Sequence, residues 1–330
     1  MNRRLRAIIS GTGLAKPSEV VPNSFFTEYL DTSDEWITSR SGIKQRYRAV
    51  DGETTVTLAR DASLTALADA GMSVSDIDLI MLATVTPDTF VPAGSCWLQA
   101  ELGAHNTPAM DVNAACAGLA YAMVQAACLI DTGCYKNILV VGSETLSRIL
   151  NYEDRTTCVL LGDGAAAVVM TPTDDPQRGL LYQELGADGG GAEHIHMPAG
   201  GSRIPACEMS VAEKLHTLRM NGREVYKFAV KKFNELVERT LEKTGTRAED
   251  LALIIPHQSN LRIINSVRDR LGLPDEKIAV NIDRWGNTSS ASIGLALDEA
   301  RRAGRVKEGD LVMLLGFGAG LTWGVLLFRM

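Results

Sequence analysis

The 330-residue sequence lacks a long hydrophobic run and an excess of basic side chains. Its most apolar segment, residues 114–130, is mostly alanine and contains Gln125, and alanine adds little to the free energy of membrane insertion. With 33 basic against 40 acidic residues and a net charge of -7, the chain has no general basic surface for binding nucleic acid. We therefore expect neither a membrane partner nor a nucleic acid partner.

Paired cysteines and metal-binding clusters are also missing. The six cysteines are scattered without a C-x-x-C pair, which excludes a dense disulfide framework. His194 and His196 lie among glycines without a third ligand at metal spacing, so we expect no metal site. The apolar stretch after the first arginines is too short for a secretory signal. These features favour a reducing, cytoplasmic location.

An internal repeat is the most informative feature that is present. Residues 71–80 (GMSVSDIDLI) align without gaps with residues 245–254 (GTRAEDLALI), and each copy follows a helical pattern and enters an apolar strand. The same order of elements continues in both copies, including short strands at 110–113 and 280–283. Residues 171–222 are rich in glycine, proline and charge, which predicts long loops. The sequence therefore predicts a duplicated α/β protein whose strands are covered on both faces.

Cys116 lies at a turn between a strand pattern and an apolar helical pattern. The unpaired N–H groups of a helix N-terminus favour a thiolate at such a position, which suits a nucleophile. A lone cysteine is, however, more often a buried structural residue.

Two polar residues of the second half follow strand patterns. His257 comes directly after an apolar strand that Pro256 ends, and Asn287 precedes a helix. Ligands of α/β proteins bind at the carboxyl ends of the strands, where both residues are expected to lie. Hydrogen-bonded core or capping roles are the alternative for each residue taken singly.

Other patterns suggest competing activities. Cys96 in residues 94–97 (GSCW), followed by His257 and Asn287, has the residue order of a papain-like protease, but the preceding signature cysteine is missing. Gly11 and Gly13 follow a strand and resemble part of a dinucleotide fingerprint, but Pro17 follows instead of a helix.

A short helix carrying an aromatic residue is predicted near the N-terminus. Thr32 and Glu35 have the spacing of a capping box, and the helix would carry Trp36 and Arg40. Further basic residues follow at Lys44, Arg46 and Arg48. This segment suits a phosphorylated ligand or, equally, a solvated basic turn.

Together these residues resemble the β-ketoacyl-acyl carrier protein synthase III family of the thiolase superfamily over essentially the whole chain. The motifs are residues 31–37 (DTSDEWI), 111–118 (DVNAACAG), 162–164 (GDG), 197–203 (MPAGGSR), 256–262 (PHQSNLR), 286–290 (GNTSS) and 316–324 (GFGAGLTWG). The resemblance implies the five-layered αβαβα thiolase fold, with halves at 1–175 and 176–330, and a homodimer.

The resemblance also implies an activity and its residues. The reaction is a decarboxylative condensation of an acyl-CoA primer with malonyl-acyl carrier protein, without a cofactor. Cys116 would accept the acyl group, and His257 and Asn287 would polarise the malonyl thioester. The backbone N–H groups of Cys116 and Ala319 would form the oxyanion hole.

Substrate-binding positions follow from the same resemblance. The residues matching CoA or pantetheine contacts are Trp36, Arg40, Arg155, Asn260 and Arg262. Those that would receive the acidic carrier protein are Lys227, Arg262 and Arg268. Arg223 and the placement of Phe90 depart from relatives, which leaves the choice of primer open. A relative in secondary metabolism and a non-catalytic subunit are the remaining alternatives.

Overall fold

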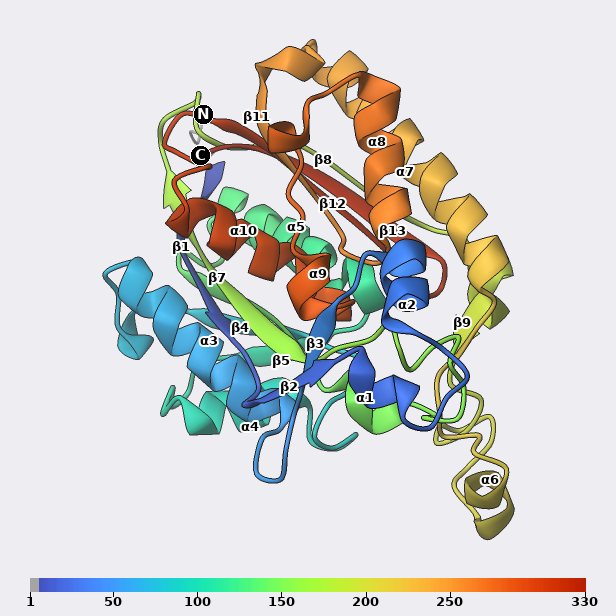
Figure 1. The fold of residues 1–330 in the computed structure, drawn as a ribbon. Helices are drawn as coiled ribbons and strands as arrows, with labels where there is room; N and C mark the ends of the chain where they lie inside the picture. The colour runs from blue at the N-terminus through green and yellow to red at the C-terminus, as the bar shows by residue number, and fades with distance from the viewer. Residues whose placement is uncertain (1–5) are drawn as a thin grey trace.

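The computed structural model describes residues 6–330 and contains two central β-sheets (Figure 1). The first has the strand order β1-β7-β6-β4-β5 and the second β11-β12-β13-β8. Their strands are β1 (Arg6–Ala15), β4 (Leu79–Ala83), β5 (Ala109–Val112), β6 (Ile138–Glu144), β7 (Gly164–Thr173), β8 (Gly179–Ala187), β11 (Leu251–Pro256), β12 (Leu311–Gly318) and β13 (Thr322–Arg329). Two small ribbons pair β2 (Glu19–Pro22) with β3 (Gln45–Arg48) and β9 (Ile195–His196) with β10 (Arg219–Met220).

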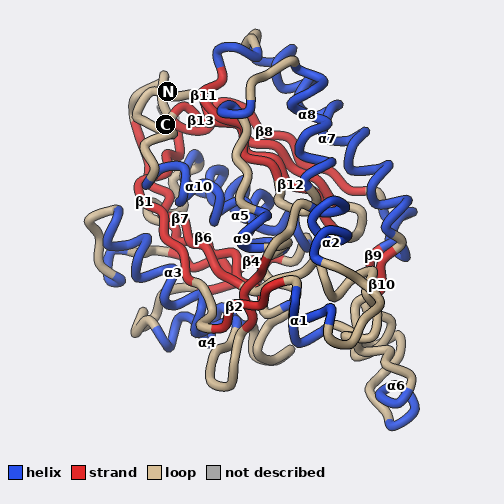
Figure 2. Tube along the Cα trace, viewed as in Figure 1, coloured by secondary structure: helices blue, strands red, loops and turns tan. Residues whose placement is uncertain are grey.

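Helices form three layers around and between these sheets (Figures 1 and 2). Helices α5 and α10 contact strands of both sheets, while α3 and α4 cover the first sheet and α7 and α8 lie outside the second. The α-helices are α1 (Ser24–Thr27), α2 (Asp34–Ser41), α3 (Thr55–Asp69), α4 (Gly94–Glu101), α5 (Gly118–Asp131), α6 (Glu208–Ala212), α7 (Gly222–Thr244), α8 (Leu261–Leu271), α9 (Ile282–Trp285) and α10 (Ser292–Arg302). This is the five-layered αβαβα thiolase architecture, so the expected fold class is confirmed.

The two halves repeat the same topology. In the first sheet β4 runs parallel to β6, and β7 and then β1 follow antiparallel; in the second, β11 runs parallel to β12, and β13 and then β8 follow antiparallel. The aligned segments share a positive-φ glycine, Gly71 or Gly245, and a one-turn 3-10 helix before the strand. All strands of the first sheet lie within residues 6–173 and those of the second within 179–329.

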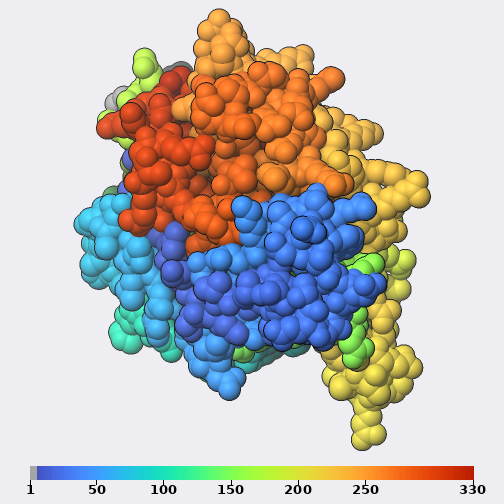
Figure 3. All heavy atoms as spheres, in the orientation of Figure 1, coloured from blue at the N-terminus to red at the C-terminus, as the bar shows by residue number. Residues whose placement is uncertain are grey.

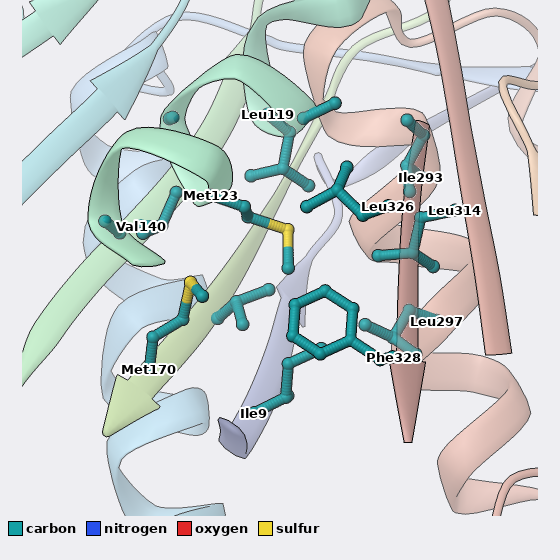
Figure 4. Close-up of a cluster of buried hydrophobic side chains, with 14 of the residues drawn as sticks. Ile9, Leu119, Met123, Val140, Met170, Ile293, Leu297, Leu314, Leu326 and Phe328 are labelled. Atoms are coloured by element: carbon teal, nitrogen blue, oxygen red, sulfur yellow. The ribbon is translucent and has the colours of Figure 1, made fainter. Parts of the chain in front are cut away.

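The apolar middle layer explains why the α5 segment carries so few polar residues. Leu119 and Met123 of α5 pack with Leu297 of α10 and with Phe328 of the second sheet, all in one buried cluster (Figure 4). A helix covered on two sides buries most of its circumference, and each large apolar side chain then contributes about 1.5–3 kcal/mol. Among the described residues, no helix is both long and apolar enough to cross a bilayer.

Three local expectations were wrong. Residues 280–283 are not a strand: after a single bridge between Ile254 and Ile278, the Gln258 side chain accepts hydrogen bonds from the N–H groups of Asn281 and Ile282, and the chain turns into α9. Residues 171–222 are not only loops, because β8 pairs with β13 at the sheet edge. The cap of α2 is Ser33 rather than Thr32, since the Ser33 hydroxyl accepts from the backbone N–H of Trp36.

Two equivalent turns meet at the centre of the molecule. A 3-10 turn at Ala115–Ala117 precedes α5, and another at Ser289–Ala291 precedes α10. Ala115 and Ser289 both have φ of 49°, and the two turns are in contact. Segments from both halves therefore converge at one place.

Candidate active site

A cavity of about 680 Å³ opens beside these turns and is lined by residues of both halves. It brings together Cys116, His257, Asn287 and Ala319, the four positions expected to perform the chemistry. Trp36, Arg40 and Asn260 also line it, whereas Arg155, Arg262, Lys227 and Arg268 lie outside its walls.

The end of β12 approaches the Cys116 turn closely. A Cβ atom added to Gly318 would lie 2.6 Å from the backbone nitrogen of Cys116, so only glycine fits there. The next residue is Ala319. The loop between β12 and β13 is also joined to the Cys116 turn by the Thr322 hydroxyl, which donates to the Ala114 carbonyl at 2.8 Å. Ala319 therefore directly follows the residue that abuts the Cys116 turn, and it lines the same cavity, which is compatible with the expected oxyanion hole.

The surroundings of Cys116 favour its protonated thiol form. Burial raises the pKa of Cys116 to about 12; the Ser289 hydroxyl lowers this value in part, and the carboxylate of Glu144 raises it. Loss of water around the sulfur thus opposes the effect of the α5 N-terminus, which by itself favours a thiolate.

His257 is fully buried at the end of β11 and is a neutral imidazole. Burial lowers the pKa of His257 to about 3. Its Nδ1 atom lies 2.5 Å from the Ser292 hydroxyl, and its ring contacts the Phe317 ring edge-to-face at 5.2 Å between centroids. Its Nε2 atom is buried without a hydrogen-bond partner among the described residues. A ring atom held in this way is free to bind a substrate oxygen in the cavity.

The Asn287 amide is oriented by its own turn. Its Oδ1 atom accepts a hydrogen bond of 2.9 Å from the backbone N–H of Ser289. A backbone N–H only donates, so the Asn287 atom that it contacts must be the amide oxygen. The two hydrogens on Nδ2 are therefore the donors that Asn287 has left. His257 and Asn287 can therefore offer two N–H groups to one oxygen atom.

Glu144 is a functional candidate that sequence reasoning missed. This fully buried carboxyl ends β6 and receives hydrogen bonds from the hydroxyls of Thr84, Thr86 and Ser290 and from the N–H of Val85. Burial raises the pKa of Glu144 despite these donors. An acidic residue at the carboxyl end of an otherwise apolar strand (ILVVGSE, residues 138–144) was the available signal.

An aromatic residue and a cation lie together beside the cavity. The Arg155 guanidinium lies over the Trp36 ring, 5.0 Å from its centroid, and donates to the Asp31 carbonyl. Asn260 caps α8 and donates to the Arg40 carbonyl at 3.0 Å, while Arg262 donates to Ser39. These bonds join α2 to α8 and hold an aromatic face where a flat ring can stack.

The residues expected to dock the carrier protein already have acidic partners in two cases. Lys227 pairs with Glu224 at 2.8 Å, and Arg268 pairs with Asp269 at 2.8 Å and Asp275 at 2.5 Å. The net positive charge of this surface is therefore smaller than the sequence suggests, and the docking role stays a prediction.

The structure separates the residues of the competing patterns. Cys96 is exposed on α4 and does not line the cavity that holds His257 and Asn287, which removes the protease arrangement. Gly11 and Gly13 allow β1 to pack against α3, since added Cβ atoms would lie 2.4 Å from the carbonyls of Ala66 and Ala62. The described residues contain no group of three or more potential metal-binding side chains.

Comparisons with known proteins agree with one family over the whole chain. The family described as 3-oxoacyl-(acyl-carrier-protein) synthase III matches residues 110–189, and its C-terminal model matches residues 241–330. A β-ketoacyl-(acyl-carrier-protein) synthase III of Caldanaerobacter subterraneus is 47% identical over 323 residues, covering 98% of this chain and 97% of that protein.

Solved structures give the same result. The 3-oxoacyl-(acyl-carrier-protein) synthase III of Aquifex aeolicus matches with a TM-score of 0.90 and 43% identity, covering 98% of this chain and all of that one. A priming β-ketosynthase from a polyketide biosynthetic pathway matches with a TM-score of 0.92 and 34% identity, covering 100% of this chain and 98% of that one.

Proposed function

The chain belongs to the 3-oxoacyl-(acyl-carrier-protein) synthase III family, and we propose that it primes fatty acid synthesis by condensing a short acyl-CoA with malonyl-acyl carrier protein. The products are a 3-oxoacyl-acyl carrier protein, CO2 and CoA. The observation that carries this function is the single cavity lined by Cys116, by the buried His257 and by Asn287, whose amide hydrogens are left as donors.

The first half-reaction loads the enzyme. The Cys116 sulfur attacks the thioester carbonyl of acetyl-CoA, and the backbone N–H groups of Cys116 and Ala319 stabilise the negative oxygen of the tetrahedral intermediate. The bond to the CoA sulfur breaks, and CoA leaves with the proton that the Cys116 thiol gives up. The products are acetyl-Cys116 and CoA.

The second half-reaction forms the carbon–carbon bond. Malonyl-acyl carrier protein loses CO2, and the electron pair of the broken carbon–carbon bond stays on the remaining fragment as an enolate. The enolate oxygen accepts hydrogen bonds from His257 and Asn287. The enolate carbon attacks the acetyl carbonyl, and the Cys116 sulfur leaves and regains a proton. Every step uses side chains and backbone groups of this chain, so we propose that no cofactor is needed.

The active form is proposed to be a homodimer in the cytoplasm. Phe90 and Val91 are 77% and 87% exposed, and Trp97 on the adjoining α4 is 45% exposed, which is an unusual concentration of apolar surface. A second copy of the chain would cover it and bring Phe90 near the acyl-binding end of its partner's cavity. All six cysteines are free, as a reducing compartment would keep them.

A second candidate function is the condensation or transfer of other acyl groups in secondary metabolism. The observation that favours it is the likeness to the polyketide priming enzyme over the whole chain. The CoA-binding residues Trp36, Arg40, Arg155, Asn260 and Arg262 would serve either role.

The choice of primer separates the two functions. Purified protein is incubated with acetyl-, branched, long-chain and aromatic acyl-CoAs, and the intact chain is weighed by mass spectrometry beside Cys116→Ala. Preferred loading of acetyl or another short acyl group, absent from the variant, supports the priming function. Loading by long or aromatic groups alone would support secondary metabolism, and no loading by any primer would contradict both.

A further inference from the structure

We propose that Ser292 is a positioning residue that fixes His257 in the tautomer with its hydrogen on Nε2. The inference rests on the proposed function, because it concerns the donor that His257 offers to the thioester oxygen. A neutral imidazole has one N–H, and whether the cavity meets a donor or a lone pair depends on which nitrogen carries it.

The contact is short and fully enclosed. Ser292 is the first residue of α10, is 1% exposed, and its hydroxyl lies 2.5 Å from Nδ1 of the equally buried His257. Water therefore does not compete for either atom. The two residues come from different elements, so the hydrogen bond also fixes the ring relative to the turn that carries Asn287.

Counting hydrogens assigns the direction of this bond. The Ser292 oxygen also accepts from the backbone N–H of Gln258 at 3.4 Å, and that N–H can only donate. Among the described residues, the hydroxyl hydrogen has no acceptor other than His257 Nδ1. Ser292 therefore donates to Nδ1, which leaves the single ring hydrogen on Nε2.

The opposite tautomer would leave one more buried group unsatisfied. With its hydrogen on Nδ1, His257 would donate to Ser292, and the buried Ser292 hydrogen would lose its acceptor. A buried donor without a partner costs about 1–3 kcal/mol. In the proposed arrangement Ser292 and Nδ1 satisfy each other, and Nε2 of His257, a residue that lines the cavity, has no partner among the described residues and is left to bind substrate.

The backbone around His257 is fixed separately, so the effect of Ser292 can be isolated. The His257 N–H donates to the Leu315 carbonyl at 2.7 Å, and the Gln258 side chain donates to the carbonyls of Pro256 and Ala279. Removing the Ser292 hydroxyl should therefore leave the His257 backbone in place and change the ring. The decarboxylation of malonyl-acyl carrier protein would suffer, whereas acetylation of Cys116 uses backbone donors and would not.

The test combines NMR spectroscopy of the free enzyme with the two half-reactions. Nitrogen-15 spectra of histidine-labelled wild type, assigned with His257→Gln, report the tautomer directly. Ser292→Ala removes the donor, and Ser292→Cys retains a weak one. Ser63→Ala is the matched control, because Ser63 is a fully buried serine of α3 that donates to the Ala59 carbonyl away from the cavity.

The expected result is hydrogen on Nε2 in the wild type and a mixture of tautomers in Ser292→Ala. Decarboxylation should fall about tenfold in Ser292→Ala, as loss of one useful hydrogen bond implies, and partly recover in Ser292→Cys. Cys116 acetylation should stay within about twofold, and Ser63→Ala should behave as wild type.

Hydrogen on Nδ1 in the wild type would overturn the proposal, and this reading is available even if Ser292→Ala fails to fold. An unchanged tautomer in Ser292→Ala would overturn it too. Failure of the proposed function looks different: the wild type would show the Nε2 hydrogen and its loss in Ser292→Ala, yet acyl-CoA would not load Cys116.

Discussion

Cys116 and Ser290 occupy equivalent positions in the two halves of the molecule. Each follows a residue with φ of 49°, and each lies two residues before a helix of the middle layer. In the first half this position holds Cys116, the proposed nucleophile. The second half uses it for a hydroxyl 2.8 Å from the buried carboxyl of Glu144 and 2.9 Å from the Ala83 carbonyl of the first sheet. The duplicated turns thus differ: one carries the proposed nucleophile, and the other joins the two halves through hydrogen bonds.

Because β12 lies so close to Cys116, adding one methyl group at Gly318 should strongly affect both the acetylation rate and the stability of the protein. Gly318→Ala places a Cβ atom 2.6 Å from the Cys116 nitrogen, so the Cys116 turn or the end of β12, which together carry the proposed oxyanion hole, must move. We expect about a hundredfold slower acetylation of Cys116 and about 1–3 kcal/mol lower free energy of unfolding. Single-turnover loading and urea denaturation measure the two effects.

Gly201→Ala is the control, since an added Cβ there meets no atom within 4 Å. Acetylation of Gly318→Ala at the wild-type rate would show that the Ala319 backbone does not serve the reaction.

The influence of Glu144 on the nucleophile predicts a shift in thiol reactivity. The Glu144 carboxylate raises the pKa of Cys116, because a negative charge stabilises the thiol over the thiolate. Replacing Glu144 with the neutral, similarly shaped Gln should lower that pKa, and Cys116 should be alkylated by iodoacetamide at a lower pH. Mass spectrometry after timed alkylation gives the pH midpoint, with Cys116→Ala correcting for the other cysteines. A midpoint equal to or above that of the wild type would disprove the coupling.

The buried imidazole predicts an unusual pH profile. Burial lowers the pKa of His257 to about 3, so the ring stays neutral through the range in which an ordinary histidine, with a pKa of about 6.5, takes up a proton. Decarboxylation of malonyl-acyl carrier protein should therefore show no histidine inflection between about pH 5 and 8. A fall in rate below about pH 6.5 in the wild type that is absent from the residual activity of His257→Gln would contradict this expectation.

The stacking of Arg155 on Trp36 beside the cavity predicts that loss of the ring changes the KM for acetyl-CoA. Trp36→Ala removes the ring under Arg155 and should raise the KM for acetyl-CoA about tenfold, since stacking and cation–π contacts are worth about 1–2 kcal/mol. Loading at saturating acetyl-CoA should change little, because Trp36 is not among the residues proposed to act on the thioester. Circular dichroism and urea denaturation of the same variant control for folding. An unchanged KM would place the CoA ring elsewhere.

Patterns that depend on neighbouring residues were predictable from the sequence. The repeat at residues 71–80 and 245–254 indicated the duplicated sheets, and Pro256 marked the point where β11 ends and His257 enters the site. Helix α5 was recognisable because it is covered on two sides and therefore almost wholly apolar.

Features that depend on distant parts of the chain were not predictable. Burial raises the pKa of Cys116, and two distant residues act on it as well: Ser289 lowers it in part and Glu144, 28 positions further along the sequence, raises it. Strand β8 was hidden because it is a partly exposed edge strand whose pairing with β13 defines it. The 2.5 Å contact of His257 with Ser292 joins residues 35 positions apart and leaves no local signal.

The central claim is that Cys116 carries the acyl group that condenses with malonyl-acyl carrier protein. The most direct measurement is a single turnover: acetylated enzyme, freed of CoA, is mixed with malonyl-acyl carrier protein, and both proteins are weighed over time. The expected result is loss of the acetyl mass from the Cys116 peptide with equal formation of the four-carbon 3-oxoacyl-acyl carrier protein, and neither event in Cys116→Ala. Acetyl groups that stay on Cys116 while the condensation product accumulates, or product formed by Cys116→Ala, would contradict the claim.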